Sequence, residues 1–344
     1  MIDRMAFSPD GRAVILEETG FDLFVWDIGT KRWAKWLKNQ PPNTPEYTAL
    51  SETTFPKQYV WRGALVYFPP DIPNYPPAEP KHTGLRDTFR LDYDDRRSFS
   101  AVSASRTLTA YGQANNLVSV TDLRHKRTLF TTPPAQIAHY SSGIPSYTDT
   151  LCGLCFSPDA KLLATATIHN DVSSHLNSSQ DAIPGPDLEI TLRNARTGEI
   201  ARRWTWKRYH EFSNDTLGMN SRSVTMEFSP DSKSLAIAGD TQLKLWDVGS
   251  GTLTHTLQNS GGVYPWTHQI MFFRKRPLVA SSGWQGRIQI WDIRSNRLVQ
   301  VFQAQPENYY GMEMALSPDE RLIANSGRTN KGRATLQVWD VSNL

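Results

Sequence analysis

A short pattern recurs along this chain and limits the folds that it can adopt. Its clearest copy runs from Met226 to Val248, MEFSPDSKSLAIAGDTQLKLWDV, and predicts three short strands, 226–228, 234–238 and 242–246. The intervening Ser-Pro-Asp-Ser and Gly-Asp-Thr favour turns, because Pro presets one backbone dihedral and Asp bonds to its own backbone. The pattern therefore predicts a small antiparallel sheet.

Most of the chain repeats this unit. Each copy has two markers, the turn after the first strand and the residues that end the third strand. The paired markers are Phe7–Asp10 with Trp26 and Asp27, Phe156–Asp159 with Ile190–Asn194, Phe228–Asp231 with Trp246 and Asp247, Phe273–Arg276 with Trp291 and Asp292, and Leu316–Asp319 with Trp339 and Asp340. Residues 98–123 keep the strands without these markers. The later Trp-Asp pairs follow one another at intervals of about 45 residues, which suits one four-stranded sheet per repeat.

A single sheet of this kind cannot bury both of its faces. Sheets stacked radially cover one another and leave few strand edges exposed. Helical periodicity is missing from every long window of the sequence, so we expect an all-β fold.

The Phe-Ser-Pro-Asp turn followed by Trp-Asp resembles the WD-repeat family of β-propellers. The resemblance covers most of the chain outside roughly residues 38–97. It implies that residues 1–344 form one seven-bladed WD-type β-propeller with one degenerate blade. The architecture is also similar to the C-terminal arrays of fungal NACHT-type WD-repeat proteins, although no nucleotide-binding module is present in this sequence.

The sequence departs from the family pattern in its polar residues. Complete WD repeats carry Gly-His before the first strand and an Asp in the second hairpin, and this chain has no Gly-His. Apolar packing should therefore matter more here than that polar network. The residues that carry the structural signature are Trp26, Asp27, Asp240, Trp246, Asp247, Trp291, Asp292, Trp339 and Asp340.

Two segments interrupt the repeats. Residues 38–97 hold ten of the 22 prolines, and Pro is unwelcome in central strands. We interpret this segment as the degenerate seventh blade with a Pro-rich insertion; the alternative is an insertion between blades of a six-bladed ring. Residues 168–187 are polar and predict an insertion in the hairpin between two strands of one blade. Neither end of the chain supplies an outer strand that would close the ring, so we expect either a last blade of three strands or a chain that is part of a larger chain or complex.

Composition places the protein among ordinary globular chains. The net charge is +3 and there are two cysteines, so neither a strongly basic surface nor a disulfide framework is indicated. No signal region and no apolar run of about 20 residues occurs. We expect a cytoplasmic protein without a transmembrane segment, and a nuclear location stays open.

Few motifs carry chemistry. Cys152 and Cys155 have metal-ligand spacing, but they fall in a predicted strand, should point to opposite faces, and are expected to be core residues. Gly327–Arg333 has the glycines of a phosphate loop but leads into a strand, so we predict a hairpin. No nucleophile–base arrangement is legible. The sequence thus predicts a protein that is not an enzyme, with no metal site and no cofactor; a propeller enzyme is the remote alternative.

Two basic segments are candidate binding sites. Arg202–Arg208 mixes basic and aromatic residues, which can bind nucleic acid or anionic lipid. It also falls on a predicted outer strand, so a solvated strand edge is the favoured interpretation. Arg274–Arg276 is expected to be a solvated turn.

Aromatic residues cluster in the connections that enter each first strand. In propellers of the WD type these connections emerge on one face, the top face. Such side chains suit a binding surface, and the alternative is that they pack the blade tops. The predicted partner-binding residues are Tyr140, Tyr147, Tyr209, Tyr264, Trp266, Trp284, Tyr309, Tyr310 and Arg328. We therefore expect a non-catalytic scaffold that binds a protein or peptide there.

Overall fold

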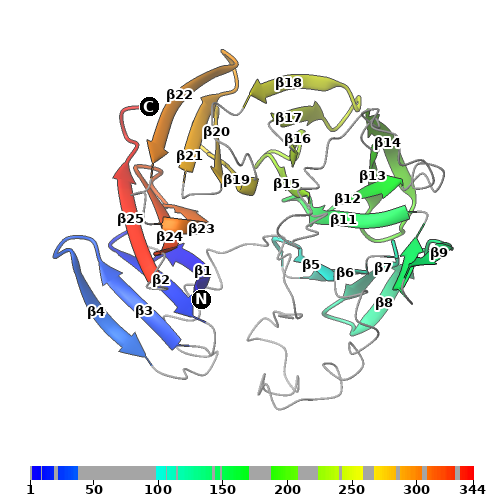
Figure 1. The fold of residues 1–344 in the computed structure, drawn as a ribbon, viewed down its shortest axis with the longest axis horizontal. Coiled ribbons are helices and arrows are strands. Elements are labelled where there is room, and N and C mark those ends of the chain that lie inside the picture. Colours follow the sequence, from blue (N-terminus) through cyan, green and yellow to red (C-terminus); the bar gives the residue numbers. More distant parts are fainter. Residues whose placement is uncertain are drawn as a thin grey trace. The chain divides into compact units, whose positions relative to one another are not determined.

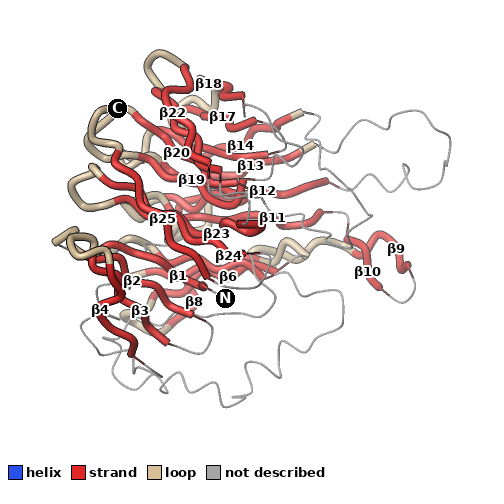
Figure 2. Tube along the Cα trace, turned by 60° about the vertical axis from the view of Figure 1, so that its left-hand side comes forward, coloured by secondary structure: helices blue, strands red, loops and turns tan. Residues whose placement is uncertain are grey.

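A computed structural model gives the structure of the chain. It describes residues 2–344 with the exception of residues 9, 19–21, 38–97, 106, 114, 142–143, 148, 170–186, 208–223, 240–241, 259–266, 284–286, 304–307 and 330–333. The described residues contain strands and turns but no helix (Figure 2). Accordingly, no helix in these ranges is long and apolar enough to cross a membrane.

The strands form antiparallel sheets in which chain neighbours pair (Figure 1). The four-stranded sheets consist of β1 (Ile2–Phe7), β2 (Ala13–Glu18), β3 (Asp22–Asp27) and β4 (Arg32–Leu37); β5 (Ser98–Val102), β6 (Leu108–Gln113), β7 (Val118–Asp122) and β8 (Arg127–Thr131); β11 (Asp149–Phe156), β12 (Leu162–His169), β13 (Leu188–Asn194) and β14 (Ile200–Trp206); β15 (Thr225–Phe228), β16 (Ser234–Gly239), β17 (Gln242–Asp247) and β18 (Leu253–Gln258); and β19 (Thr267–Phe272), β20 (Leu278–Gly283), β21 (Arg287–Asp292) and β22 (Arg297–Gln303). The smaller sheets consist of β23 (Asn308–Leu316), β24 (Leu322–Thr329) and β25 (Ala334–Asp340), and of β9 (Ile137–Ser141) with β10 (Ile144–Tyr147).

The chain divides into two compact units. The first comprises Met1–Phe55, Thr241–Leu245 and Leu253–Leu344, and the second comprises Pro56–Asp240 and Trp246–Thr252. The boundary runs through the sheet β15–β18. The arrangement of strands is described below for each unit by itself.

In the first unit the sheet β23–β25 packs against a sheet on each of its faces. Met5, Phe7 and Leu16 of the sheet β1–β4 bury against Ala315 and Ala324. On the other face, Ile288, Ile290 and other residues of the sheet β19–β22 meet Met314 and Ile323. Alternation of side chains along each strand makes this two-sided packing possible.

The second unit follows the same logic. On one face of the sheet β11–β14, Leu151, Leu154 and Phe156 pack with residues of the sheet β5–β8. On the other face, Ile190 and its neighbours pack with Met226, Phe228 and Trp246. Each buried Leu, Ile or Phe contributes about 1.5–3 kcal/mol, so the stacked sheets are stabilised mainly by apolar contact between them.

The all-β fold class is confirmed, and the three strands predicted between Met226 and Val248 are correct to within one residue. Seven blades are not confirmed by the described residues. Residues 38–97, interpreted as the degenerate blade, lie outside the described residues, and so do residues 170–186 between the paired strands β12 and β13. The hairpin β9–β10 was not predicted.

Candidate interaction surfaces

In four of the described sheets the turn between the first two strands is closed by one serine and one aspartate. In the β15–β16 turn, Ser229 Oγ donates to Asp231 Oδ1 at 2.6 Å and accepts the Ser234 N–H at 2.9 Å. Asp231 Oδ1 also accepts the Lys233 N–H at 3.1 Å. The same serine–aspartate bond occurs in three further turns, at Ser8 and Asp10, Ser157 and Asp159, and Ser317 and Asp319. These hydroxyl groups and carboxylates therefore hold turns together.

The residue after this aspartate lies in the left-handed region of backbone space. Its φ is 71° at Gly11, 56° at Ala160, 60° at Ser232 and 63° at Glu320. A residue with a Cβ is strained there by about 1–2 kcal/mol. Glu320 is also buried, so its occurrence at this position needs a compensating interaction.

A second aspartate holds the turn after the third strand. Asp247 Oδ1 accepts both the N–H and the Oγ–H of Ser250 at 2.7 Å, and these bonds lower the pKa of the Asp247 carboxyl group. Asp27, Asp292 and Asp340 accept bonds at the same place. The predicted signature aspartates thus lie within turns, except Asp240, which is outside the described residues.

Two sheets without Trp-Asp use the same device. Asp122 accepts the N–H of His125 at 3.0 Å and faces its Nδ1 at 3.1 Å. The backbone bond and then the side-chain bond from His125 lower the pKa of Asp122 to about 2. Asn194 accepts the N–H groups of Arg196 and Thr197 with its amide oxygen. Alignment of the third strands would have found both residues from the sequence.

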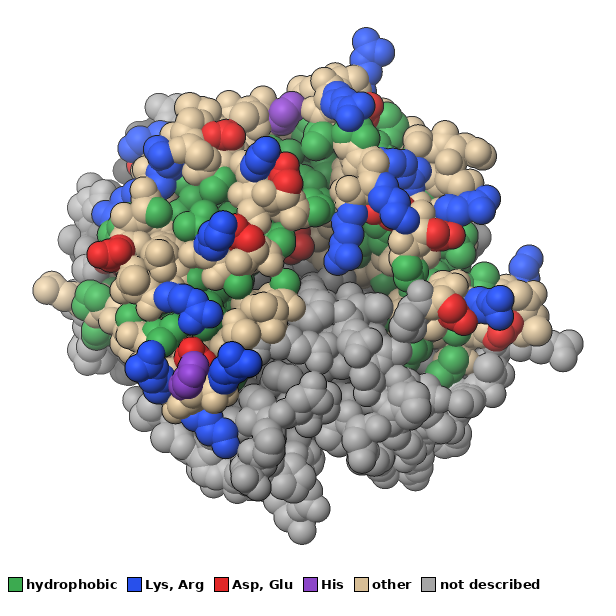
Figure 3. Space-filling model, turned by 180° about the vertical axis from the view of Figure 1, so that it is seen from behind, with side chains coloured by type: hydrophobic (Ala, Val, Ile, Leu, Met, Phe, Trp, Pro, Cys, Tyr) green, Lys and Arg blue, Asp and Glu red, His purple; other side chains and the backbone are tan. Residues whose placement is uncertain are grey.

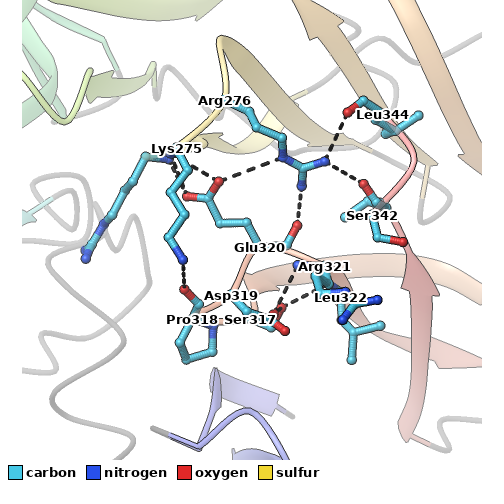
Figure 4. Close-up of polar contacts among 12 residues, drawn as sticks. Lys275, Arg276, Ser317, Pro318, Asp319, Glu320, Arg321, Leu322, Ser342 and Leu344 are labelled. Carbon is cyan, nitrogen blue, oxygen red and sulfur yellow. Dashed lines mark hydrogen bonds and ion pairs between the residues drawn. The ribbon is translucent and has the colours of Figure 1, made fainter.

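The β19–β20 turn lacks its own serine and aspartate, and Glu320 takes their place from the β23–β24 turn. The Glu320 carboxylate accepts the Arg274 N–H at 2.5 Å and the Lys275 N–H at 3.1 Å. Figure 4 shows Glu320 directed toward that turn. The bonds to two N–H groups explain why a strained, buried glutamate is tolerated.

Arg276 completes this connection. Its guanidinium donates to the carbonyl oxygens of Val341 at 2.6 Å, of Leu344 at 3.2 Å and of Glu320 (Figure 4). It also lies 3.9 Å from the Glu320 carboxylate, and only 22% of its side chain is exposed. The expectation of a solvated turn is thus wrong for Arg276, because a neighbouring turn provides acceptors that the local sequence does not show. A surface hollow of about 510 Å³ borders this network.

The basic-aromatic strand β14 is a sheet edge whose charges are largely paired. Arg203 Nε lies 3.1 Å from Glu189, and Arg202 donates to the Ser250 carbonyl oxygen. Trp204 and Trp206 pack on Trp246, with ring centroids 6.4 and 5.5 Å apart. Lys207 is also paired, at 2.6 Å from Asp187. These contacts weigh against nucleic-acid or lipid binding through residues 202–208, of which Arg208 is not described.

Cys152 and Cys155 are buried free thiols, as expected for core residues. Burial raises the pKa of the Cys155 thiol far above its usual value. Both side chains belong to the same apolar cluster, so the expectation of opposite faces is wrong. The register shifts between Leu151 and Gly153, and a bulge at Cys152 reverses the alternation of side chains.

A group of cations at the β7–β8 turn was not singled out from the sequence. Arg124, His125, Lys126 and Arg127 follow Asp122 after one intervening residue, Leu123, and Arg196 reaches the same carboxylate from the β13–β14 turn, with Nη1 at 3.6 Å. All five of these residues are exposed, whereas Asp122 is buried. Figure 3 shows Lys and Arg side chains distributed over one face of the molecule, interspersed with Asp and Glu side chains. The signal in the sequence is the run Arg-His-Lys-Arg.

Comparison with known proteins finds similarity to WD-repeat proteins. The profile of the family WD domain, G-beta repeat, matches residues 212–247. Periodic tryptophan protein 2 of Arabidopsis thaliana is 26% identical over 212 residues, which cover 56% of this chain and 22% of that protein. These matches support a relationship of the chain to WD-repeat proteins. Proteins with WD repeats are generally non-catalytic scaffolds for protein interaction.

Other WD-repeat comparisons are more distant or more partial. Antiviral protein SKI8 of Saccharomyces cerevisiae is 26% identical over 176 residues, which cover 45% of this chain and 44% of that protein. A chain of the solved Crystal Structure of Mitotic Checkpoint Complex aligns with 99% of this chain and 87% of its own length, at 14% identity and a TM-score of 0.46. The chain spans less than half the length of either curated relative that it matches.

The aromatic residues predicted to bind a partner are only partly placed. Tyr209, Tyr264, Trp266 and Trp284 lie outside the described residues. For the remaining five the structure gives only the backbone, which places them on the strand pairs β9–β10 and β23–β24, at Tyr140, Tyr147, Tyr309, Tyr310 and Arg328. Tyr310 pairs with Arg328 across β23 and β24.

The signature tryptophans lie in the packed sheets. Trp291 is 1% exposed and Trp246 is 4% exposed. Trp26 and Trp339 are half-buried, and the Trp339 ring stacks on Phe302 with centroids 5.2 Å apart. No three His, Cys, Asp or Glu side chains come together as a metal-binding group in the described ranges.

Proposed function

We propose that this chain is a non-catalytic scaffold that binds a protein or peptide. The observation that carries the proposal is that polar side chains of the turns are repeatedly used to stabilise the fold itself. In the described turns, serine hydroxyls and aspartate carboxylates bond to the backbone beside them, as at Ser229, Asp231 and Asp247. Because these side chains stabilise the turns, the residues on the outer surfaces can differ from one repeat to the next. We place partner binding in those variable surface residues.

The proposed binding surface is the end of the sheets opposite the serine–aspartate turns. In each antiparallel sheet, the turns after the first and third strands lie at one end. The turn after the second strand and the connection to the next sheet lie at the opposite end. The strands β23 and β24 are nine and eight residues long, whereas β15 has four. Their paired residues Tyr310 and Arg328 lie toward that opposite end, and aromatic and Arg side chains are common anchors in protein interfaces.

Affinity purification with mass spectrometry tests the proposal. The full chain is compared with the triple variant Tyr264→Ala, Trp266→Ala and Tyr310→Ala. A matched control, Arg294→Ala with Arg297→Ala, alters exposed residues of the β21–β22 turn at the other end. We expect the triple variant to lose at least tenfold of a specifically captured protein while the control retains it. Retention of every partner by the triple variant would remove the aromatic surface from consideration.

A direct assay addresses catalysis. We propose that the purified chain turns over no substrate, because the described carboxylates of the turns serve as acceptors for backbone N–H groups. A hydrolase or transferase activity that copurifies with the chain and is abolished by a single substitution in it would contradict this proposal.

A further inference from the structure

We propose that the β7–β8 turn, together with Arg196, binds a phosphorylated segment of a partner protein. This phosphate site, defined by Arg124, His125, Lys126, Arg127 and Arg196, lies wholly within the second unit. It is at the turn end of its sheets and does not depend on the aromatic surface proposed above.

The buried carboxylate of Asp122 contacts two residues of the site. Its side chain is 5% exposed and faces both His125 Nδ1 at 3.1 Å and Arg196 Nη1 at 3.6 Å. The side chains of His125 and Arg196 are themselves 61% and 57% exposed. One buried carboxylate thus draws together cationic groups from two sheets, while their outer surfaces stay accessible.

The charges leave an excess of positive sites. Four of the five residues are permanent cations, and His125 adds a further donor. The carboxylates of the same two turns are Asp122 and Glu199, and Glu199 already accepts the Thr197 hydroxyl at 3.0 Å. A phosphoryl group carries a charge near −2 at pH 7 and three strong acceptor oxygens, and Arg guanidinium groups match it with paired hydrogen bonds.

The shape of the site favours a peptide phosphate over nucleic acid. The cations are confined to two adjacent turns, whereas single-stranded nucleic acid is bound along extended basic grooves with aromatic stacking platforms. The aromatic ring beside these turns, Phe130, packs under Gly198, where an added Cβ would lie 2.7 Å from the ring. Phe130 is therefore engaged by the fold at its contact with Gly198, and the site is one of phosphate recognition.

Binding of the full chain to an immobilised library of random-sequence phosphoserine peptides tests the inference. The same library without phosphate and a library with glutamate at that position are probed beside it. We expect capture that depends on phosphate. The variant Arg124→Gln, Arg127→Gln and Arg196→Gln should weaken it at least tenfold, because each Arg removed takes away a charge-assisted contact.

A matched control lies in the β21–β22 turn. Arg294→Gln with Arg297→Gln removes two exposed cations from the same type of turn and should change capture less than twofold. Unchanged melting temperatures establish that the variants are folded. Absence of phosphate-dependent capture, equal capture by the triple variant, or tighter binding of a single-stranded oligonucleotide than of any peptide would overturn the inference.

The result is separable from the proposed function. Loss of the aromatic residues Tyr264, Trp266 and Tyr310 should leave capture of phosphopeptides unchanged, because none of these three residues belongs to the β7–β8 or β13–β14 turn. If that aromatic variant alone abolishes phosphopeptide capture, the phosphate site is wrongly placed at the β7–β8 turn.

Discussion

The β15–β16 and β19–β20 turns do the same work by different means. In the first, Ser229 and Asp231 bond to each other and to the backbone of their own turn. In the second, the sequence reads Phe273–Arg276, and its N–H groups at Arg274 and Lys275 find their acceptor in Glu320, a residue of another sheet. A repeat that has lost its own closing residues is thus completed by its neighbour.

This difference couples two sheets. A turn closed by its own residues can hold its shape whatever lies beside it. The β19–β20 turn depends on the β23–β24 turn, and the dependence is mutual because Arg276 donates to the backbone of Glu320 and of Val341. We therefore expect substitutions here to destabilise two sheets together, whereas those in the β15–β16 turn act on one.

The largest effect is expected from Arg276→Met. Methionine keeps part of the packing volume but leaves the carbonyl oxygens of Val341 and Glu320 without their donor and removes the cation beside the buried Glu320 carboxylate. Removing one partner of a largely buried, hydrogen-bonded pair should lower the free energy of unfolding by about 2–3 kcal/mol. Equilibrium urea unfolding measures it.

Arg294→Met is the control for that variant. Arg294 is exposed on the turn of the same sheet, and a surface substitution should change stability by less than about 0.5 kcal/mol. Equal stabilities of the two variants would show that the contacts of Arg276 contribute nothing to the coupling between these sheets.

A pair of glycine substitutions separates backbone strain from side-chain contact. Ala160 and Glu320 both have positive φ, at 56° and 63°. Ala160→Gly relieves strain and should be neutral or stabilising by up to about 1 kcal/mol. Glu320→Gly relieves the same strain but leaves the N–H groups of Arg274 and Lys275 without their acceptor, so it should destabilise by about 1–2 kcal/mol.

Opposite signs for these two changes in the urea midpoint are the expected outcome. If Glu320→Gly stabilises the protein as much as Ala160→Gly, the carboxylate is merely tolerated at this position and the comparison between the two turns fails.

The sequence predicts what is local and periodic. Strand positions between Met226 and Val248 follow from alternation and turn residues, and they agree with β15–β17. The pairing of Glu320 with Arg274 joins residues more than 40 positions apart, and it depends on how two sheets stack. The bulge at Cys152 likewise depends on the partner strand, so strict alternation assigns Cys152 and Cys155 to the wrong faces.

The candidate surfaces also contain one part that the sequence shows and another that depends on how the sheets pack. The cations of the β7–β8 turn are contiguous in the sequence, from Arg124 to Arg127, but Arg196 joins them only through the packing of two sheets. The aromatic surface stays a prediction, because it was inferred from where connections fall in the repeat and its side chains lie outside what the structure describes.

Ser229→Ala probes the turn closed by its own residues. The substitution removes a donor to Asp231 and an acceptor for the N–H of Ser234, in a largely buried place. We expect a loss of about 1–1.5 kcal/mol in the free energy of unfolding. Native-state hydrogen exchange should show faster exchange at Ser234 while amides of β23–β25 remain protected; spread of the effect to β23–β25 would contradict local closure.

The smallest effect is expected from Asp122→Asn, which converts one kind of closing residue into the other, as found at Asn194 in the β13–β14 turn. Hydrogen bonds from His125 hold the pKa of Asp122 at about 2 in the folded protein, below the value of about 3.9 in unfolded chains. The unfolded state therefore binds the proton more readily, and the stabilisation is fully present above about pH 4 and is lost as the pH falls through about 2.

Asparagine keeps the acceptor oxygen but cannot titrate. Urea midpoints of the wild type and of Asp122→Asn should differ by a constant amount from pH 5 to 7, converge as the pH falls from about 4 to about 2, and coincide only below about pH 2. The reciprocal variant Asn194→Asp should gain a pH dependence of the same sign if the β13–β14 turn supplies comparable N–H donors. A midpoint difference that does not change between pH 7 and 2 would show that the charge of Asp122 has no part in closing its turn.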